Sequence, residues 1–571
     1  MINIEAAITA KYPALASTPP GLRSTALALL RKLLHEDEIN GFLRDNPDLT
    51  GFAWIDKVFE FLNFSYTVSA RDRSYIPASG RVVIVANHPI GSLDGLALLR
   101  MVGEVRRDVR IIANDMLSQF HALNDLILPV DNMTGANVVR SYRQVLKALE
   151  QDRAIIVFPA GEVSRASSTG VKDGPWRPGF LHFARKSNAP VLPVQVKARN
   201  SLLFYGASMV FKPMSTLLLS SEMFRHQTKV IHFNVGKLIP VRHLRSMELH
   251  DRTLVKRLHR HVYKLHKPDK HDFITERTVA HPEPRQLLQQ ELQQATLLGT
   301  TRDNNAIYLV DWSPDSAVIR ELGRLRELTF RLVGEGTGKT RDLDIYDCHY
   351  RHLVLWDREA LEIAGAYRLG EGKALLDKLG TGGFYTSTLF HYEPAFTHYM
   401  MKGLELGRSF VSPAYWGKAS LDYLWQGLGA YLAHHPDIRY VFGPVSMSAT
   451  YPKALIEELV FYFSTYYGSQ QKLASARHPF RIRDAHHSRL QALYQGLDRR
   501  QAMALLLAAF QESGLKIPVL FKQYTALFED QGFETLVFSS DPDFADCLDG
   551  MCMADLSQLR ANKRERYIAS R

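Results

Sequence analysis

The sequence predicts an α/β protein made of two domains. Its 571 residues exceed what a single hydrophobic core usually holds. Apolar residues make up 46% of the chain and charged residues 23%, a balance typical of folded proteins and not of disordered ones. Short apolar runs rich in β-branched residues predict buried strands in both halves, and the pattern of these runs changes across residues 270–306.

Three strand-like runs organise the first half of the chain. They cover residues 82–85, 154–158 and 191–196. The first run ends in a loop that carries His88 and Asp94, and loops mounted on rigid strands commonly hold acid–base groups. An imidazole can deprotonate an alcohol near neutral pH, and a nearby carboxylate fixes its tautomer. We therefore expect His88 to be a general base and Asp94 to orient it.

These motifs resemble the glycerolipid acyltransferase family, over roughly residues 50–270. The resemblance implies that His88 takes the proton from an acceptor hydroxyl, whose oxygen then attacks an acyl thioester. It also implies a glycerolipid-acyltransferase-like α/β domain in which the motif blocks bind substrate. The substrate-binding residues that it implies are Asn87, Gly161, Glu162 and Arg165.

Two features depart from the usual pattern of that family. Five residues separate His88 from Asp94, where the family usually has four. Ala160 stands where the family usually has a glutamate that helps to hold a phosphorylated acceptor. Both features look like a branch of the family linked to ornithine-type aminolipids, so we expect an acceptor without a phosphomonoester.

Charge is unevenly distributed along the chain. Residues 1–270 hold 37 basic and 23 acidic side chains, whereas residues 271–571 hold 33 and 36. The basic half culminates in residues 252–270 and suits an anionic partner, although a solvated helix face is the alternative for that run. Because the sequence shows no signature of a nucleic-acid-binding fold, we expect a membrane surface and an acyl carrier protein as partners, and no nucleic acid.

Residues 1–5 show no basic region followed by an apolar core, and no run of 18 apolar residues occurs, so we expect neither a signal peptide nor a membrane-spanning helix. We therefore expect peripheral association with the cytoplasmic face of the inner membrane. Two apolar stretches, residues 54–62 and 202–219, suit either the membrane interface or the protein core.

The changes in pattern predict four regions. These are an N-terminal helical region (1–50), the O-acyltransferase domain (51–270), a linker (271–305), and a second domain with a C-terminal extension (306–571). Pro-rich and Gln-rich segments predict the linker. Within the second domain we expect a helix near residues 322–331 and strands at residues 352–356, 362–369 and 404–411.

Six charged residues and one aromatic residue of the second domain resemble those of GNAT-type N-acyltransferases, in the branch shared by acyl-homoserine-lactone synthases and ornithine N-acyltransferases. The matching residues are Arg326, Phe330, Asp344, Asp347, Arg368, Glu405 and Arg408. The resemblance covers roughly residues 306–470 and implies a GNAT-like α/β domain that acylates an amine.

Each charged type has a chemical task in such a site. A carboxylate in a cleft can take the proton that an amine loses when it attacks a thioester, and Glu405 is our candidate. Asp344 and Asp347 would bind a cationic amino acid, and the three arginines would bind a carboxylate or the carrier's phosphopantetheine. Structural ion pairs between these acids and arginines are the competing interpretation. The usual CoA-pyrophosphate loop is not clear in the sequence, which favours acyl carrier protein over acyl-CoA as the donor.

Together, the two resemblances imply a bifunctional acyltransferase of aminolipid synthesis, similar to a fused ornithine lipid synthase. The second domain would N-acylate ornithine or a similar amino acid with a 3-hydroxyacyl group, and the first would O-acylate the resulting lyso-aminolipid. We expect no metal and no bound cofactor, because the thioester supplies the driving force. One alternative is a phospholipid-remodelling O-acyltransferase fused to an N-acyltransferase for glycine, glutamine or lysine. Another is a membrane-surface binding module with one degenerate domain.

Overall fold

The computed structural model describes residues 34–113, 121–129, 135–167, 170–201, 222–225, 230–267 and 272–569, together with residues 24, 27–28, 31–32 and 204. The chain divides into two compact units, Met1–Ala280 and His281–Arg571. The boundary lies within residues 271–305, where the sequence predicts a linker. This segment also gives the second unit a helix, α14 (Arg285–Gln294), and an edge strand, β10 (Thr296–Thr300).

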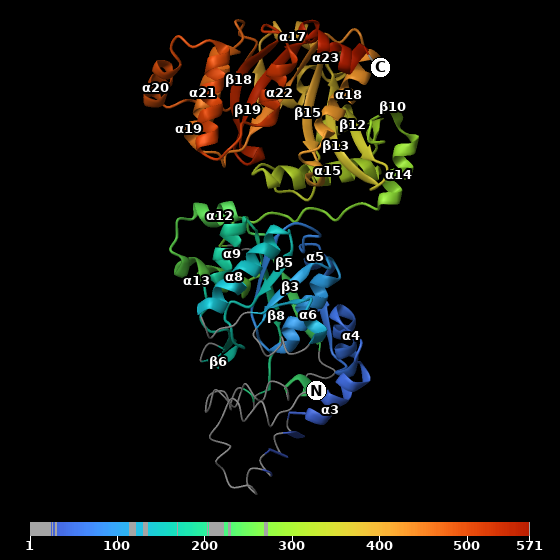
Figure 1. Ribbon diagram of the computed structural model, residues 1–571, viewed down its shortest axis with the longest axis vertical. Coiled ribbons are helices and arrows are strands. Elements are labelled where there is room, and N and C mark those ends of the chain that lie inside the picture. The colour runs from blue at the N-terminus through green and yellow to red at the C-terminus, as the bar shows by residue number, and fades with distance from the viewer. Residues whose placement is uncertain are drawn as a thin grey trace. The chain divides into compact units, whose positions relative to one another are not determined.

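The first unit is built on a mainly parallel sheet (Figure 1). The described strands follow the order β1-β9-β8-β2-β5-β3-β4, and β9 runs antiparallel to β8. Their bounds are β1 (Ser65–Val68), β2 (Val82–Ala86), β3 (Val109–Ala113), β4 (Ile127–Pro129), β5 (Ala154–Val157), β8 (Val191–Lys197) and β9 (Val230–Val235). A small hairpin, β6 (Arg165–Ser167) with β7 (Gly170–Lys172), follows β5. The three strands expected from the sequence are β2, β5 and β8.

Helices cover both faces of this sheet, which explains why β2 and β5 are buried along their whole length. Alternate residues of β2 point to opposite faces, so Val82 and Ile84 join one core and Val83 and Val85 the other. The first core receives α3 (Glu36–Asp45), α4 (Gly51–Phe61) and α6 (Ser92–Gly103). The second receives α8 (Gly135–Glu150), α9 (Gly179–Ser187), α12 (Val241–Ser246) and α13 (Asp251–Val262). A short helix, α5 (Ala70–Arg73), follows β1.

The apolar stretch at residues 54–62 belongs to the core. Trp54, Ile55, Val58 and Leu62 are all buried in the first of the two cores. The stretch at residues 202–219 lies outside the described residues, apart from Phe204. Across the part of the chain that the structure describes, no helix combines the length and the apolar character needed to cross a bilayer.

The second unit contains a mainly antiparallel sheet. The strand order is β10-β11-β12-β13-β15-β16-β19-β18 in the described chain, and one pair, β15 with β16, is parallel. The further strands are β11 (Ala306–Val310), β12 (Arg351–Asp357), β13 (Glu362–Glu371), β15 (Gly403–Val411), β16 (Tyr440–Met447), β18 (Phe533–Asp541) and β19 (Cys547–Asp555). A separate pair joins β14 (Phe390–Tyr392) to β17 (Ala474–Ala476). The predicted strands at residues 352–356, 362–369 and 404–411 are β12, β13 and β15.

Helices again cover both faces of the sheet. On one side, α14 and α15 (Ala317–Leu332) pack against β11, β12 and β13. On the other, the core includes α18 (Ser420–Ala433), α19 (Lys453–Tyr466), α20 (Asp484–Tyr494), α21 (Arg499–Glu512) and α22 (Val519–Leu527). Shorter helices are α16 (Gly372–Leu379), α17 (Phe396–Met401) and α23 (Ala561–Arg564). The residues after 470, which the sequence leaves unassigned, thus complete both the sheet and its helical cover.

Candidate active sites

The first candidate site lies at the carboxyl ends of the central parallel strands. Strand β2 pairs in parallel with both β5 and β8, so the loops after these strands meet at one edge. His88 follows β2 by two residues, and Asp94 lies in the first turn of α6. The His88 Nδ1 atom lies 3.2 Å from Asp94 Oδ2. The structure therefore brings together the two residues that the sequence predicts as base and orienting acid.

Asp94 is fixed by its surroundings. It is fully buried, and its Oδ2 accepts hydrogen bonds from the backbone N–H groups of Ile90 (2.8 Å) and Gly91 (3.2 Å). Burial raises the pKa of this carboxyl above its usual value, while His88 and the two amides oppose that rise. The His88 side chain remains 18% exposed, so part of the imidazole is accessible to a substrate. This geometry suits a general base oriented through Nδ1.

The loop after β5 packs directly against His88. The Phe158 ring stacks on the His88 ring with centroids 4.1 Å apart, and the Ser164 N–H donates to the His88 carbonyl over 2.7 Å. Gly161 has a φ of 68°, a left-handed conformation that favours glycine, and its N–H closes a turn onto the Phe158 carbonyl. The two sequence blocks thus form one site.

The other predicted substrate-binding residues of this unit differ in their surroundings. Glu162 and Arg165 form an ion pair of 3.0 Å near the protein surface. Asn87 is buried, and its side-chain amide bridges the backbone of Val196 in both directions, at 2.9 and 2.7 Å. This bridge joins β2 to β8, so the contacts of Asn87 are structural. Its role in substrate binding stays a prediction.

Sequence reasoning missed a buried carboxylate that holds the site together. Asp173 Oδ1 accepts hydrogen bonds from the His88 N–H (3.1 Å) and the Ser164 hydroxyl (2.5 Å). Its Oδ2 accepts one from the Trp176 indole (2.9 Å), and its own N–H donates to the Tyr263 hydroxyl of the segment after α13 (2.9 Å). Asp173 therefore fixes the backbone at His88 from a distant part of the chain. No local motif in one sequence marks such a residue.

The second candidate site gathers the charged residues expected from the sequence. Arg326, on α15, donates to Asp347 over 2.7 Å, and Arg368, on β13, lies 2.7 Å from Asp344 and 3.3 Å from Asp347. Arg408, on β15, lies 3.6 Å from Asp344. All three arginines are buried or nearly so. These ion pairs are the structural interpretation that the sequence left open, and they compete with a role for the two aspartates in substrate binding.

Asp342 and His352 also belong to this network of buried arginines and aspartates, and burial together with the ion pairs determines the protonation state of its members. Arg408 Nε lies 2.9 Å from Asp342. Burial alone would raise the pKa of the Asp347 carboxyl, but Arg326 and Arg368 hold it below its usual range. Burial and the neighbouring Arg326 lower the pKa of His352 to about 3, so this imidazole is neutral at physiological pH.

Aromatic rings extend this network. The Arg408 guanidinium lies over the rings of Tyr385 (4.4 Å) and Phe544 (4.9 Å). Phe330 contacts Phe544, with ring centroids 5.1 Å apart. Phe330 thus reaches the site through a residue of the chain's last hundred positions, a segment that the sequence left without a role.

Glu405 is fully buried on β15 and accepts four hydrogen bonds. Its donors are the Tyr350 hydroxyl, the Tyr385 N–H (3.2 Å), the Thr386 N–H (2.8 Å) and the Thr386 hydroxyl (2.5 Å). Burial raises the pKa of Glu405, and these donors together with Arg368 oppose the rise. A carboxylate with a raised pKa is a better proton acceptor. Because its donors include two hydroxyl groups, a proton can reach it through Tyr350 or Thr386.

Arg368 has hydrogen-bonding capacity left over. Its side chain is fully buried, with the guanidinium over the rings of Tyr350 and Tyr385. Its Nη1 forms ion pairs with Asp344 and Asp347. Its Nε and Nη2 have no hydrogen-bond partner in the described part of the chain. Buried donors without partners are unusual and point to a missing acceptor.

Three further acids line the same region of the second unit. Asp549 (β19) lies opposite Ser446 (β16), whose hydroxyl donates to Glu335 over 3.0 Å. Asp541 (β18) is the diagonal cross-strand neighbour of Asp549. We call Glu335, Asp541 and Asp549 the carboxylate face. All three are buried, and none forms an ion pair with a described residue. Burial raises the pKa of Glu335 to about 7 and that of Asp549 well above its usual value, although Arg408 opposes both rises.

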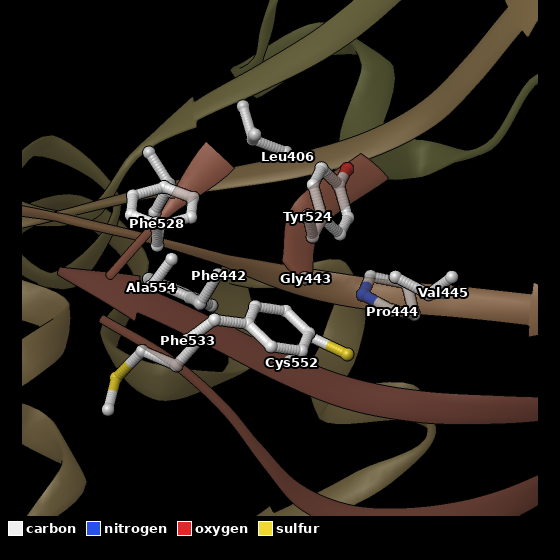
Figure 2. A pocket seen from close by; sticks show the side chains of 12 residues that line it. Leu406, Phe442, Gly443, Pro444, Val445, Tyr524, Phe528, Phe533, Cys552 and Ala554 are labelled. Atoms are coloured by element: carbon white, nitrogen blue, oxygen red, sulfur yellow. The ribbon is translucent and has the colours of Figure 1, made fainter. Parts of the chain in front are cut away.

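A narrow apolar pocket lies where β15 and β16 separate (Figure 2). The parallel ladder between these strands ends at Glu405 and Phe442, although both strands continue. Beyond the ladder, the residues that line the pocket include Leu406, Pro444, Val445, Tyr524, Phe528 and Phe533. The pocket therefore begins one residue from Glu405 along β15.

Comparison with known families identifies both units. A family model described as "Acyltransferase" matches residues 6–267, and one described as "Acetyltransferase (GNAT) domain" matches residues 325–426. A glycine N(alpha)-acyltransferase from Bacteroides thetaiotaomicron is 31% identical over 50% of this chain and 88% of its own length. The chain is a fusion of an acyltransferase domain and a GNAT domain. Both resemblances drawn from the sequence are thereby confirmed, and the protein is an enzyme of O-acyl and N-acyl transfer.

Other relatives of this bifunctional acyltransferase carry related activities. A lyso-glycine lipid O-acyltransferase from Phocaeicola vulgatus is 30% identical over 38% of this chain and 78% of its own length. An L-ornithine N(alpha)-acyltransferase from Brucella abortus is 32% identical over 23% of this chain and 50% of its own length. The relatives thus include both amino-acid N-acyltransferases and a lipid O-acyltransferase.

Proposed function

We propose that the two domains act in sequence to build a doubly acylated amino-acid lipid. The GNAT domain N-acylates an amino acid with a 3-hydroxyacyl group, and the acyltransferase domain then O-acylates the new hydroxyl. The observation that carries this proposal is the presence of N-acyl and O-acyl transfer domains on one chain, with relatives that act on an amino acid and on a lyso-lipid. Neither ornithine nor glycine has an alcohol hydroxyl. The hydroxyl that is acylated in the second step must therefore belong to the first acyl chain.

In the first step, the neutral amine attacks the thioester carbonyl, a C–N bond forms and the C–S bond breaks. Glu405 receives the amine's proton through the hydroxyl of Tyr350 or Thr386. The thiolate leaves and takes up a proton. The apolar pocket of Figure 2, whose lining includes Leu406 directly after Glu405 in the sequence, suits the start of the acyl chain.

In the second step, His88 removes the proton from the 3-hydroxyl of the lyso-lipid. The resulting oxyanion attacks a second thioester, and the protonated imidazole returns the proton to the leaving thiolate. Asp94 stabilises the imidazolium that forms between these events. Tethering the two domains raises the effective concentration of the intermediate for the second step.

We propose ornithine as the amino acid. Among the described residues, no cation forms an ion pair with the carboxylate face, although Arg408 lies near enough to lower its pKa values. A second ammonium group on the substrate would supply that ion-pair partner. The unpartnered donors of Arg368 suit the substrate carboxylate. The ornithine N(alpha)-acyltransferase relatives support this choice. Glycine is the second candidate, because the glycine N(alpha)-acyltransferase relative matches over 88% of its own length.

A substitution in the carboxylate face distinguishes these two amino acids. Asp549→Asn is expected to raise the KM for ornithine about 10- to 100-fold, because a charge-assisted hydrogen bond contributes about 1.5–3 kcal/mol. The measurement is N-acyl transfer at varied ornithine and glycine concentrations. Asp555→Asn, at the end of the same strand and paired with Arg439, is the matched control. An unchanged KM for ornithine in Asp549→Asn would contradict the proposed contact.

Donor and location complete the proposal. We propose acyl carrier protein as the donor, because the sequence lacks a clear loop for the CoA pyrophosphate, and acyl-CoA is the alternative. We also propose peripheral binding to the cytoplasmic face of the inner membrane, where the lyso-lipid would be available. Assays with matched acyl-carrier and acyl-CoA donors decide the first point.

Mass spectrometry of lipids tests the proposed function. The chain is expressed in a bacterial host that lacks aminolipids, and its lipids are compared with those of the host carrying an empty vector. We expect a new lipid with one amino acid, one amide-linked 3-hydroxyacyl chain and one ester-linked chain. Altered phospholipid acyl chains without a new amine-containing lipid would instead favour the remodelling enzyme. No change in either lipid class would favour the membrane-surface binding module.

A further inference from the structure

Basic and acidic residues are unequally distributed between the two helical faces of the first unit. On one face, lysine and arginine residues number three in α8, two in α9 and four in α13. The acidic residues of these three helices are Glu150 and Asp251. On the opposite face, α3, α4 and α6 together contain more acids than bases. Figure 1 shows α8, α9 and α13 on one side of the sheet and α4 and α6 on the other. Basic residues therefore outnumber acidic ones on the helices of one face, and acidic residues outnumber basic ones on the helices of the other.

The three basic helices form one continuous surface. Tyr142 of α8 contacts Phe183 of α9, with ring centroids 5.1 Å apart. Arg185 of α9 lies 2.5 Å from Asp251 at the start of α13. We call the outward side of α8, α9 and α13 the basic face.

The cations of the basic face are largely free to meet a partner. Arg185 and Arg260 form ion pairs with Asp251 and Asp272. The other seven form no ion pair with any residue that the structure describes; they are Arg140, Arg143, Lys147, Lys186, Arg252, Lys256 and Arg257. Within the α8 part, Val139 is 50% exposed and Tyr142 36% exposed among these cations. Exposed apolar and aromatic side chains among basic ones are typical of surfaces that lie at a membrane interface.

The basic face also borders the catalytic edge. Tyr263, just after α13, accepts a hydrogen bond from the N–H of Asp173, and Asp173 in turn accepts one from the N–H of His88. In the parallel part of the sheet, helices that follow a strand begin at the edge where His88 lies, so α8 and α9 also start there. A partner on the basic face would therefore lie beside the O-acyl transfer site.

We propose that the basic face docks this enzyme onto the surface of an anionic lipid bilayer. The inference rests on the proposed lipid substrate of the first domain, because a two-chain lipid remains in the bilayer. Charge complementarity selects an anionic surface, and the breadth of the face over three helices suits a flat partner. The exposed Val139 and Tyr142 reach the headgroup region, and the basic side chains contact lipid phosphates.

Vesicle binding tests this proposal. The full chain is sedimented with phosphatidylcholine vesicles or with vesicles that also contain phosphatidylglycerol, at low and high salt. We expect binding to the anionic vesicles, lost at high salt because the attraction is screened. The triple variant Arg140→Glu, Arg143→Glu and Lys147→Glu is expected to bind on the order of 100-fold more weakly. The control variant Lys378→Glu, Lys516→Glu and Lys522→Glu, with the same change in net charge on exposed residues of the second unit, is expected to bind like the wild type.

A second measurement separates the lipid surface from an acidic carrier protein. O-acyl transfer is measured with a detergent-dispersed acceptor and acyl carrier protein as donor, where no bilayer is present. An unchanged KM for the carrier in the α8 variant, together with lost vesicle binding, supports the proposal. Intact vesicle binding by the α8 variant would overturn the proposal. If that variant bound vesicles but had a raised KM for acyl carrier protein, the basic face would be assigned to the carrier. Vesicle binding needs no turnover. A chain that binds vesicles but makes no aminolipid would therefore contradict the proposed function and leave the docking proposal intact.

Discussion

Replacing His88 with alanine is expected to leave a host that accumulates the mono-acylated amino-acid lipid and makes none of the doubly acylated product. The imidazole is the group that stacks on Phe158 and meets Asp94, and the described residues place no second histidine in that position. General-base catalysis typically contributes about 10²–10⁴-fold to a rate, and we expect O-acylation to fall by about this factor. Mass spectrometry of the host lipids and an O-acylation assay with purified lyso-lipid measure the two effects.

The design of that experiment contains its own folding control. Each unit has its own core, so N-acyl transfer should continue in His88→Ala. His232→Ala removes another exposed imidazole of the same sheet, one that contacts Thr67, and should keep both activities. Full O-acylation by a folded His88→Ala variant would remove His88 from the mechanism.

The parts of the fold that sequence could predict are those with local signals. The continuous β-branched runs at residues 82–85 and 154–158 are strands because both faces of the sheet are covered, and a two-sided apolar environment selects such runs. The spacing of His88 and Asp94 allowed their pairing to be expected, since the start of α6 brings residues so close in sequence into contact.

The supporting contacts could not be predicted, because they join distant parts of the chain. Asp173 binds the backbone of a residue 85 positions earlier, and Tyr350 binds Glu405, 55 positions later. The carboxylate face depends on the register of β16, β18 and β19, which no local pattern specifies. The apolar stretch at residues 54–62 was ambiguous for a similar reason. A helix with an apolar stripe can face a core or a bilayer, and only the tertiary structure decides between them.

Replacing Glu405 with glutamine is expected to block the first step. Glutamine keeps the size of the side chain but removes the charge, and its amide nitrogen would face donors such as the Thr386 N–H or the Tyr350 hydroxyl. The variant can no longer receive the amine's proton, so we expect N-acyl transfer to fall by about 10²–10⁴-fold. Neither the mono-acylated nor the doubly acylated lipid should then appear in the host.

The pH dependence of the wild-type enzyme gives an independent reading of the same residue. Burial raises the pKa of Glu405, so the carboxylate that accepts the proton forms at a higher pH than it would in water. N-acyl transfer should therefore fall as the pH drops through this raised pKa, because protonated Glu405 cannot act as a base. The residual activity of Glu405→Gln should lack this fall with pH. If Glu405 were purely structural, the substitution would lower the rate but the fall with pH would remain.

A matched substitution separates loss of the base from loss of a buried carboxylate in general. Glu458, on α19, is also buried and accepts a hydrogen bond from Tyr494. Glu458→Gln should keep N-acyl transfer, while both variants are compared for thermal unfolding. O-acylation of a supplied N-(3-hydroxyacyl) amino acid should persist in Glu405→Gln, because His88 belongs to the other unit. Normal N-acylation by folded Glu405→Gln would instead assign proton removal to solvent, with Glu405 serving only to position Tyr350 and Thr386.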